Sequence, residues 1–387
     1  MKHSITGAAL AAVVAVATVG VAPAQAEITV GFVTSQSGPA SSIGVLYDKG
    51  MKAALEYATT VGDEKVKFIQ LDDSSDPSTA TRNARKLIEE NKVDLVIGTA
   101  TAASSNAMVA VANELKVPLL AISPITITPS DTGERWAICI PQPPGLMVKV
   151  VVDRAQRDGV KKMAYIGYSD AWGDLVYNGA QKPAEADGIK ITTNERYART
   201  DTSVTGQVLK ILATKPDAVL LGGSATQGAL PPLTLAERGY KGPLYGTPAL
   251  LNTDFIRVGG KAVEGVQVSA GPVIVAEQLP DTHFSKKISM TFREDYQKAN
   301  GAAPTDGFSA YSFDSWLIFL DAATRAMAKA KPGTPEFRTA LRDAIFTTKD
   351  VVGTHAIYNF KPGESYGVDE RSLVLVRLVN GQWKYEP

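Results

Sequence analysis

The chain has 387 residues, of which 44% are hydrophobic, and its 40 Lys and Arg residues balance 40 Asp and Glu residues. This balance argues against a nucleic-acid or anionic-membrane surface as the partner, because both require clustered basic charge. The length and hydrophobic content suit a globular protein of two domains.

The amino-terminal segment 1–26 has the features of an export signal. It has a short basic start, an apolar Ala/Val-rich run over about residues 7–22, and the small-residue sequence AQA at 24–26. A membrane anchor is the alternative, but the apolar run is shorter than the roughly 20 residues that a membrane span requires. We therefore predict cleavage after Ala26 and an exported protein.

Short apolar runs then alternate with amphipathic stretches as far as residue 123. The expected strands and helices, in chain order, are strand 28–34, helix 41–58, strand 67–71, a helix from Asp76-Pro77, strand 94–98 and strand 117–123. Apolar strands that alternate with helices predict a parallel sheet that is covered on both faces.

A second series of elements begins after the Pro-rich segment 140–145. Its expected strands are 163–168, 188–193, 217–223, 242–247 and 265–270, and its later helices are about 283–299, 307–330 and 334–345. The sequence Asn380-Gly381 between two apolar runs predicts a final pair of antiparallel strands. The predicted fold class is α/β, with two doubly wound parallel-sheet domains.

Motifs for catalysis and for cofactor binding are missing from the sequence. It contains neither GxGxxG nor GxxxxGK[ST], and Ser224 in GGSATQG lacks the pattern of a nucleophile elbow. Cys139 could be a catalytic thiol, but the apolar segment WAICI favours a buried residue. His283 and His355 lie in polar, loop-like stretches without an evident nucleophile partner. We therefore expect a protein that is not an enzyme and has no cofactor.

Three carboxylates gather in QLDDSSD, residues 70–76. A calcium loop is one interpretation, but the segment lacks the glycine and the distal glutamate of that loop. A turn at the end of a strand, in which Asp76 caps the next helix, explains the pattern better. No metal site is expected here.

The segment IGTATAASSNA, residues 97–107, places a helix of small and hydroxyl residues directly after a strand. A helix amino terminus leaves its first N–H groups unpaired and carries about half a positive charge. With Thr101 as the cap, the N–H groups of Ala102, Ala103 and Ser104 could hold an anion without any basic side chain. An ordinary helix start, packed against its neighbours, is the alternative from this stretch alone.

The order of several motifs resembles the leucine/isoleucine/valine-binding type of periplasmic solute receptor. The motifs run through nearly the whole chain after the signal: SGPASSIG (37–44), DDSSDPSTATRNARKLIEENKVDLVIG (72–98), ISPITITPS (122–130), YSDAWGD (168–174), RTDTSVTGQVLKILATKPDAVLLGG (199–223) and DGFSAYSFDSW (306–316). No single motif is as specific as a metal-ligand pattern, but the ordered set is hard to obtain by chance.

The resemblance implies two lobes that close on a small ligand and deliver it to the permease subunits of an ABC importer in the inner membrane. It also implies a periplasmic location, a monomer, and a three-segment hinge, with crossings near Gln142, Pro272 and Lys349. The lobes implied by these crossings are 27–142 plus 273–348, and 143–272 plus 349–387.

The resemblance further implies which positions hold the ligand. Ala102 stands where amino-acid binders have a serine for the ligand carboxylate, so only the backbone donors remain. The turn from Ser123 through Thr126 supplies the other side of this carboxylate seat. The positions implied for the remaining wall are Ile43, Trp172, Ser224 and Phe308.

Pro248 is the largest departure from the family pattern. Amino-acid binders place a glutamate at this position to hold the ligand ammonium group, and no acidic residue lies between Gly242 and Asn252 to replace it. An alignment slip is the alternative explanation. A buried ammonium without a partner costs several kcal/mol. The expected ligand is therefore a carboxylate without an α-amino group, such as a benzoate- or phenylpropanoid-like acid.

Other functions with the same fold stay open from the sequence. The ligand could be a branched-chain amino acid, an amide or a dicarboxylate, and the protein could be a sensor without an importer. An enzyme would require an acid, base or nucleophile constellation that the motifs do not supply.

Overall fold

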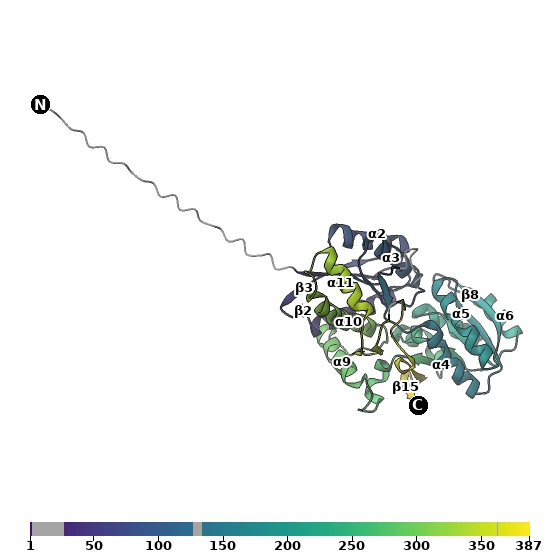
Figure 1. Ribbon diagram of the computed structural model, residues 1–387. Helices are drawn as coiled ribbons and strands as arrows, with labels where there is room; N and C mark the ends of the chain where they lie inside the picture. Colours follow the sequence, from purple (N-terminus) through teal and green to yellow (C-terminus); the bar gives the residue numbers. More distant parts are fainter. Residues whose placement is uncertain (2–26, 127–133, 362) are drawn as a thin grey trace.

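The computed structural model describes residue 1 and residues 27–126, 134–361 and 363–387. The predicted export signal lies outside these ranges, apart from residue 1, and so does part of the motif ISPITITPS. The described residues form two sheets with helices on both faces (Figure 1), so the predicted α/β fold class is confirmed. We call the elements around the first sheet the first lobe, and those around the second sheet the second lobe.

The first sheet has the strand order β2-β3-β1-β4-β5-β6. Its strands are β1 (Ile28–Thr34), β2 (Thr60–Val61), β3 (Glu64–Asp72), β4 (Leu95–Gly98), β5 (Leu119–Ala121) and β6 (Ala137–Cys139). All neighbours pair in parallel except β2 and β3. The central strands are buried on both faces, which explains why their sequences are continuous apolar runs.

The second sheet has the order β15-β14-β11-β10-β9-β7-β8. Its strands are β7 (Lys162–Tyr168), β8 (Lys190–Tyr197), β9 (Ala218–Gly222), β10 (Leu244–Gly246), β11 (Gln267–Ala270), β14 (Val374–Val379) and β15 (Gln382–Glu386). The predicted terminal hairpin is confirmed, with positive φ angles at both Asn380 and Gly381. Because β14 and β15 pair antiparallel, this sheet is mixed rather than wholly parallel as predicted.

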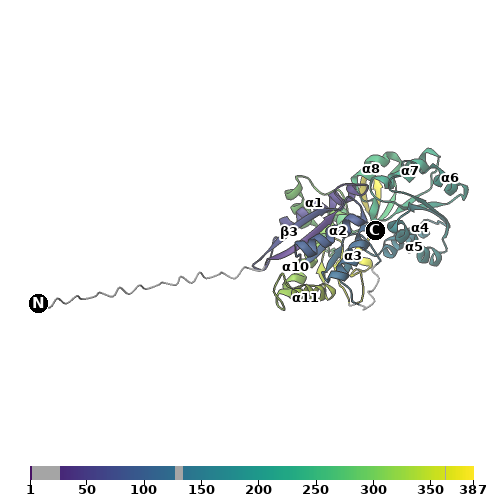
Figure 2. The same ribbon diagram turned by 90° about the horizontal axis from the view of Figure 1, so that it is seen from above.

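Helices cover both faces of each sheet (Figures 1 and 2). In the first lobe they are α1 (Ser41–Tyr57), α2 (Pro77–Arg85), α3 (Ala102–Leu115), α9 (Lys286–Asn300), α10 (Ser309–Met327) and α11 (Pro335–Phe346). In the second they are α4 (Pro144–Arg157), α5 (Ala171–Ala186), α6 (Thr205–Ala213), α7 (Leu230–Glu237) and α8 (Thr253–Gly259). Contacts of α1 with α9 and α10, and of α2 with α3, define the two faces of the first sheet.

Two local predictions at strand ends are confirmed. Asp76 caps α2, because its carboxylate accepts a hydrogen bond from the Thr79 N–H at 2.7 Å. Cys139 is completely buried in β6, and burial raises the pKa of its thiol to about 12. A thiol with so high a pKa is a packed core group and not a nucleophile.

The segment after α11 packs with the first lobe. It contains the short strands β12 (Val351–Val352) and β13 (Ile357–Tyr358), and the backbone N–H groups of Thr354 and His355 donate to Asp314 in α10. Tyr366 forms a parallel bridge to Cys139 at the edge of the first sheet. We therefore place the third crossing after Tyr366, whereas the sequence analysis placed it near Lys349.

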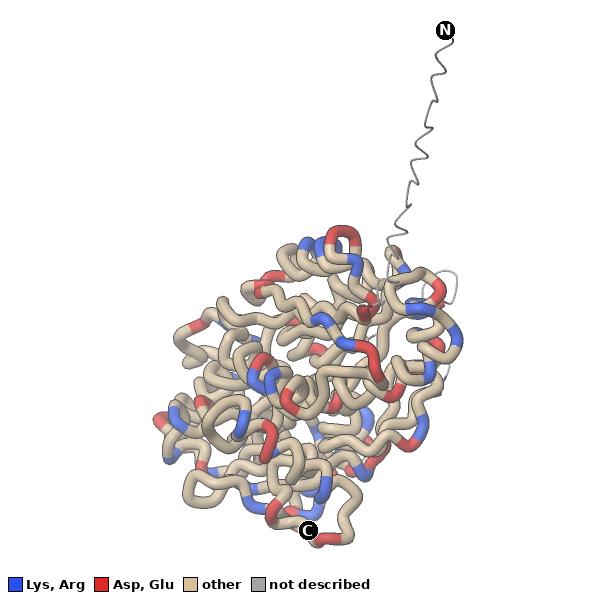
Figure 3. The backbone as a smooth tube through the Cα atoms, turned by 90° about the vertical axis from the view of Figure 1, so that its left-hand side faces the viewer, with Lys and Arg blue, Asp and Glu red and all other residues tan. Residues whose placement is uncertain are grey.

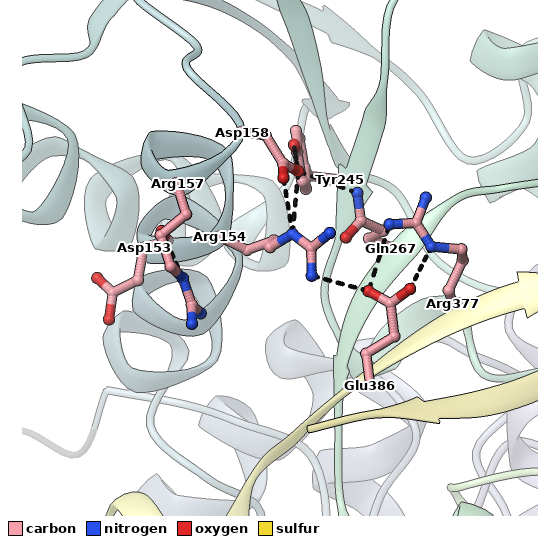
Figure 4. Close-up of polar contacts among 8 residues, drawn as sticks. All are labelled: Asp153, Arg154, Arg157, Asp158, Tyr245, Gln267, Arg377 and Glu386. Atoms are coloured by element: carbon pink, nitrogen blue, oxygen red, sulfur yellow. Dashed lines mark hydrogen bonds and ion pairs between the residues drawn. The ribbon is translucent and has the colours of Figure 1, made fainter.

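A polar network fastens the carboxyl-terminal strand pair to α4 (Figure 4). Arg154 donates to Asp158 at 2.9 Å and to Glu386 at 3.0 Å. Glu386 also pairs with Arg377, and the Tyr245 hydroxyl donates to Asp158 at 2.6 Å. These groups are partly buried, so they are screened less than surface ion pairs and connect α4, β10, β14 and β15.

Both signs of charge are mixed along the face of the molecule that Figure 3 shows. Within the ranges that the structure describes, none of the helices combines the length and the apolar content that a membrane crossing requires.

Candidate ligand-binding site

A cavity of about 40 Å³ lies between the two lobes, at the ends of their parallel strands. The lining residues are Ile43, Tyr47, Ala100, Ala102, Ser123, Pro124, Pro141, Met147, Trp172, Arg199, Ser224, Pro248, Ala249, Phe308 and Tyr311. Ligands of open α/β sheets bind at the carboxyl ends of the strands, where successive loops converge. The cavity occupies the corresponding place in both lobes.

The first-lobe wall contains the start of α3. Thr101 is the cap, since its hydroxyl accepts from the Ser104 N–H at 3.1 Å, as predicted. Ala102 is the first helical residue and lines the cavity with a single methyl group. Ser123 lies beside it, with its hydroxyl 2.8 Å from that of Ser105. This wall offers N–H and hydroxyl groups without a charged side chain.

Replacement of Ala102 by leucine is expected to weaken solute binding at least tenfold, about 1.4 kcal/mol. The added methyl groups would fill the space next to the helix start, because Ala102 is buried against the cavity. Calorimetry gives the affinity, and Ala110→Leu, an exposed position of the same helix, is the control. Equal affinities for the two variants would place the solute elsewhere.

Trp172 contributes the flat wall of the second lobe. It lies in the first turn of α5, where Asp170 accepts hydrogen bonds from the N–H groups of Trp172 (3.0 Å) and Gly173 (3.2 Å). Only 6% of Trp172 is exposed. Opposite it, Phe308 from the start of α10 packs edge-to-face on Tyr47 with ring centroids 6.0 Å apart. Aromatic rings from both lobes thus face the cavity.

Arg199 is the lining residue of greatest chemical consequence that the sequence analysis did not select. Its guanidinium group donates to Asp170 at 2.6 Å and to the Ser224 hydroxyl at 3.1 Å. It also lies over the ring of Tyr168, 4.1 Å from the centroid. These contacts fix the cation at the cavity wall. Its position directly after β8 was the available signal, because that strand ends at the same edge of the sheet as β7.

Charge in the cavity lining is of one sign. Arg199 is its charged residue, and no Asp or Glu side chain belongs to the lining as the described residues define it. Pro248 lies in this wall, as predicted, at the start of a short helical turn that the Thr247 hydroxyl caps. The described residues also include no group of three His, Cys, Asp or Glu side chains suited to a metal ion.

Of the ten residues predicted for the site, seven line the cavity: Ile43, Ala102, Ser123, Trp172, Ser224, Pro248 and Phe308. Thr101 and Ala103 belong to the same helix start but do not line it. The Thr126 side chain is exposed and lines a separate surface groove with Ser365 and Tyr366. His355, expected in a polar loop, is instead buried against α10, because its segment packs on the first lobe.

The lobes touch each other on one side of the cavity. The side-chain amide of Asn252 donates to the Ser42 carbonyl at 2.9 Å, and the Gly307 N–H donates to the Leu251 carbonyl at 3.2 Å. These hydrogen bonds join residues of the second lobe to residues of the first. They are the contacts expected of a closed arrangement, in which the cavity is covered.

Known proteins resemble this chain over most of its length. A family model described as "Periplasmic binding protein" matches residues 27–365. An extracellular ligand-binding receptor from Rhodopseudomonas palustris is 41% identical, with a TM-score of 0.89, and the match covers 94% of this chain and 100% of that one. The curated Leu/Ile/Val-binding protein homolog 3 of Brucella melitensis is 25% identical over 265 residues, 66% of this chain and 71% of its own.

More distant solved structures share the fold alone. A leucine binding protein from Thermotoga maritima is 21% identical with a TM-score of 0.80, and covers 93% of this chain and 98% of its own. A solute binding protein of an ABC transporter from R. palustris, solved in complex with benzoate, is 20% identical with a TM-score of 0.73. It covers 93% of this chain and 95% of its own.

The two-lobed fold, the cavity between the lobes and the family match together define the class: this chain belongs to the periplasmic binding protein family. Curated relatives of the chain carry the name Leu/Ile/Val-binding protein. Members of this family are periplasmic solute-binding proteins, not enzymes, and work with ABC transporter components.

Proposed function

We propose that this protein is the receptor of an ABC importer for a small carboxylate without an α-amino group, an aromatic acid of the benzoate or phenylpropanoid type. The observation that carries the proposal is the charge of the cavity lining, in which Arg199 is the charged group and its ion-pair partner Asp170 lies outside the lining. The protein acts as a monomer without catalysis, and is exported by cleavage after Ala26.

The carboxylate seat has two sides in this proposal. Arg199 supplies charge-assisted hydrogen bonds from the second lobe, and the N–H groups at the start of α3 supply donors from the first lobe. A carboxylate that contacts both sides binds the closed form more strongly than the open form. Since a ligand shifts a conformational equilibrium only by such a difference in affinity, this contact drives closure.

The aromatic part of the ligand is supported by the remaining wall. Trp172, Phe308 and Ile43 are buried and largely apolar, and Pro248 lines the same wall. By the family resemblance, Pro248 stands where an amino-acid receptor has a carboxylate. Rings in such a wall gain about 0.5–1.5 kcal/mol from aromatic contacts beyond the burial of area. The benzoate complex of the R. palustris relative supports the idea that this fold can enclose an aromatic acid.

Binding of phenylpropanoate is expected to be at least tenfold, and up to about a hundredfold, tighter than binding of phenylalanine. Both solutes offer the same ring and carboxylate, but the ammonium group of phenylalanine would meet Pro248 and an apolar wall. An unpaired ammonium that costs about 3 kcal/mol gives roughly the upper figure. Calorimetry with this matched pair, and with leucine, measures the difference.

A receptor for branched-chain amino acids is the second candidate, because curated relatives carry that name. Equal or tighter binding of phenylalanine or leucine would favour this candidate. It would also mean that the cavity opens to an acidic group that does not line it in the closed arrangement.

A further inference from the structure

All three crossings between the lobes meet around one cavity residue, Tyr311. This tyrosine lies in the first turn of α10, only 4% of it is exposed, and its side chain lines the cavity. Its hydroxyl donates to the Gln142 side-chain carbonyl at 2.6 Å. Gln142 lies between β6 and α4, so this bond connects the cavity wall directly to the first crossing.

Gln142 extends the connection to the third crossing. Its amide nitrogen donates to the backbone carbonyl of Ser372 at 2.9 Å, shortly before β14 begins. Gln142 and Ser372 are each 1% exposed, so both hydrogen bonds are shielded from water. Loss of either partner would leave a buried polar group unpaired, which destabilises the arrangement.

The other contact of Tyr311 leads to the second crossing. Its ring stacks on His355 with centroids 3.9 Å apart and planes 15° from parallel. The Nδ1 edge of the imidazole lies against the backbone of Gly271, directly after β11, where an added Cβ atom would lie 1.7 Å from Nδ1. Any side chain at Gly271 would therefore displace the ring that supports Tyr311.

We propose that Tyr311 is the positioning residue that links occupation of the cavity to the hinge. A solute that presses on the tyrosine ring fixes the hydroxyl against Gln142 and the ring against His355, and so stabilises the closed geometry of all three crossings. The proposal rests on the receptor function proposed above, in which a solute closes the lobes, but not on the class of solute.

Tyr47 shows that this arrangement is particular to Tyr311. It lines the same cavity and its hydroxyl also makes a short buried hydrogen bond, but the acceptor is the Ile122 carbonyl of the same lobe, at 2.7 Å. Tyr47 therefore lines the cavity through contacts within the first lobe, whereas the hydroxyl of Tyr311 contacts a crossing.

Tyr311→Phe is expected to raise the dissociation constant about tenfold, mainly through faster dissociation, because the lost hydrogen bond belongs to the closed form. Gln142→Leu removes the same bond together with the bond to the Ser372 carbonyl, and should weaken binding at least as much. The double variant should also be about tenfold weaker, not a hundredfold, since both changes break one connection. Calorimetry and stopped-flow tryptophan fluorescence measure these constants.

Tyr245→Phe is the matched control. Tyr245 is buried, donates a hydrogen bond of 2.6 Å to Asp158 within one lobe, and does not line the cavity (Figure 4). It should alter the melting temperature without changing affinity more than twofold. A similar loss of affinity in this control, or additive effects of Tyr311→Phe and Gln142→Leu, would overturn the proposal.

The solute for these measurements is whichever of phenylpropanoate and leucine reduces the radius of gyration of the wild-type protein in X-ray scattering. Compaction by leucine alone would reject the proposed ligand class and leave the test of Tyr311 intact. If neither solute compacts the wild-type protein, the receptor function and the role of Tyr311 both fail.

Discussion

Arg199→Gln is expected to weaken binding of phenylpropanoate by about a hundredfold. Charge-assisted hydrogen bonds contribute about 1.5–3 kcal/mol each, and the upper part of this range corresponds to such a loss. The substitution also leaves the Asp170 carboxylate, now held at 2.6 Å by the guanidinium group, without its cation beside the cavity. An anionic solute would then approach an uncompensated negative charge.

Calorimetry with phenylpropanoate and with its neutral amide shows whether Arg199→Gln acts through the lost charge or through the changed shape of the side chain. The amide should lose less affinity than the acid in Arg199→Gln, because it carries no charge. Arg196→Gln is the control: Arg196 pairs with Asp174 at 3.1 Å and lies near the rings of Tyr165 and Tyr177, but does not line the cavity. Equal losses in the two arginine variants would exclude Arg199 as the anion-binding group.

Lowering the pH from neutral to about 4.5 is expected to reduce the free energy of unfolding of the wild-type protein by about 3 kcal/mol more than that of the His355→Phe variant. Burial lowers the pKa of His355 to about 3, from an ordinary value of 6.5. Between these values the unfolded chain binds a proton that the folded chain does not, so stability falls as the pH falls from about 6.5 towards 3. Each pH unit in this window costs about 1.4 kcal/mol.

Phenylalanine suits this position because neither ring nitrogen of His355 has a hydrogen-bond partner of ordinary geometry among the described residues. The neighbouring carbonyl of Gly307 favours the protonated form only slightly. Burial raises the pKa of Asp314 to about 6, which acts in the opposite direction, but Asp314 and His283 are present in both proteins. Urea unfolding at several pH values gives the difference, and parallel curves would contradict the prediction.

The sequence was most informative about elements whose own residues determine them. The strand predicted at 28–34 is β1, because its apolar side chains are buried on both faces of the sheet. The hairpin at Asn380-Gly381 follows from the positive φ angles that these two residue types adopt easily. The two-residue strands β2, β12 and β13 were not predicted, because so short a segment has no periodicity.

Site residues could be predicted where a single loop of the family pattern contains them. They could not be predicted where their role depends on contacts between different loops. Trp172 and Pro248 follow strands of the second sheet, and the family resemblance selected them. Arg199 lies in one of the quoted motifs, but its role depends on Asp170 and Ser224, which belong to two other loops. Pairing across loops is a tertiary property that the spacing within one motif does not contain.

The third crossing shows a related limit. Residues 351–366 were assigned to the second lobe because the family resemblance implied a crossing near Lys349. The contacts of Asp314 with Thr354, His355 and Tyr358 instead hold this segment to α10. Asp314 is a buried carboxylate within α10, and the sequence around it does not indicate which groups it will bind.

The polar network around Glu386 has a consequence for the order in which the protein folds. On one side β11 pairs with β14, and the whole of α9, α10 and α11 lies between these two strands in the chain. The second sheet can therefore be completed, and Arg154 can meet Glu386, only after β14 and β15 have been synthesised. Contacts of such high sequence separation form slowly. The second lobe should thus remain incomplete, and accessible to chaperones, until these two strands have been synthesised.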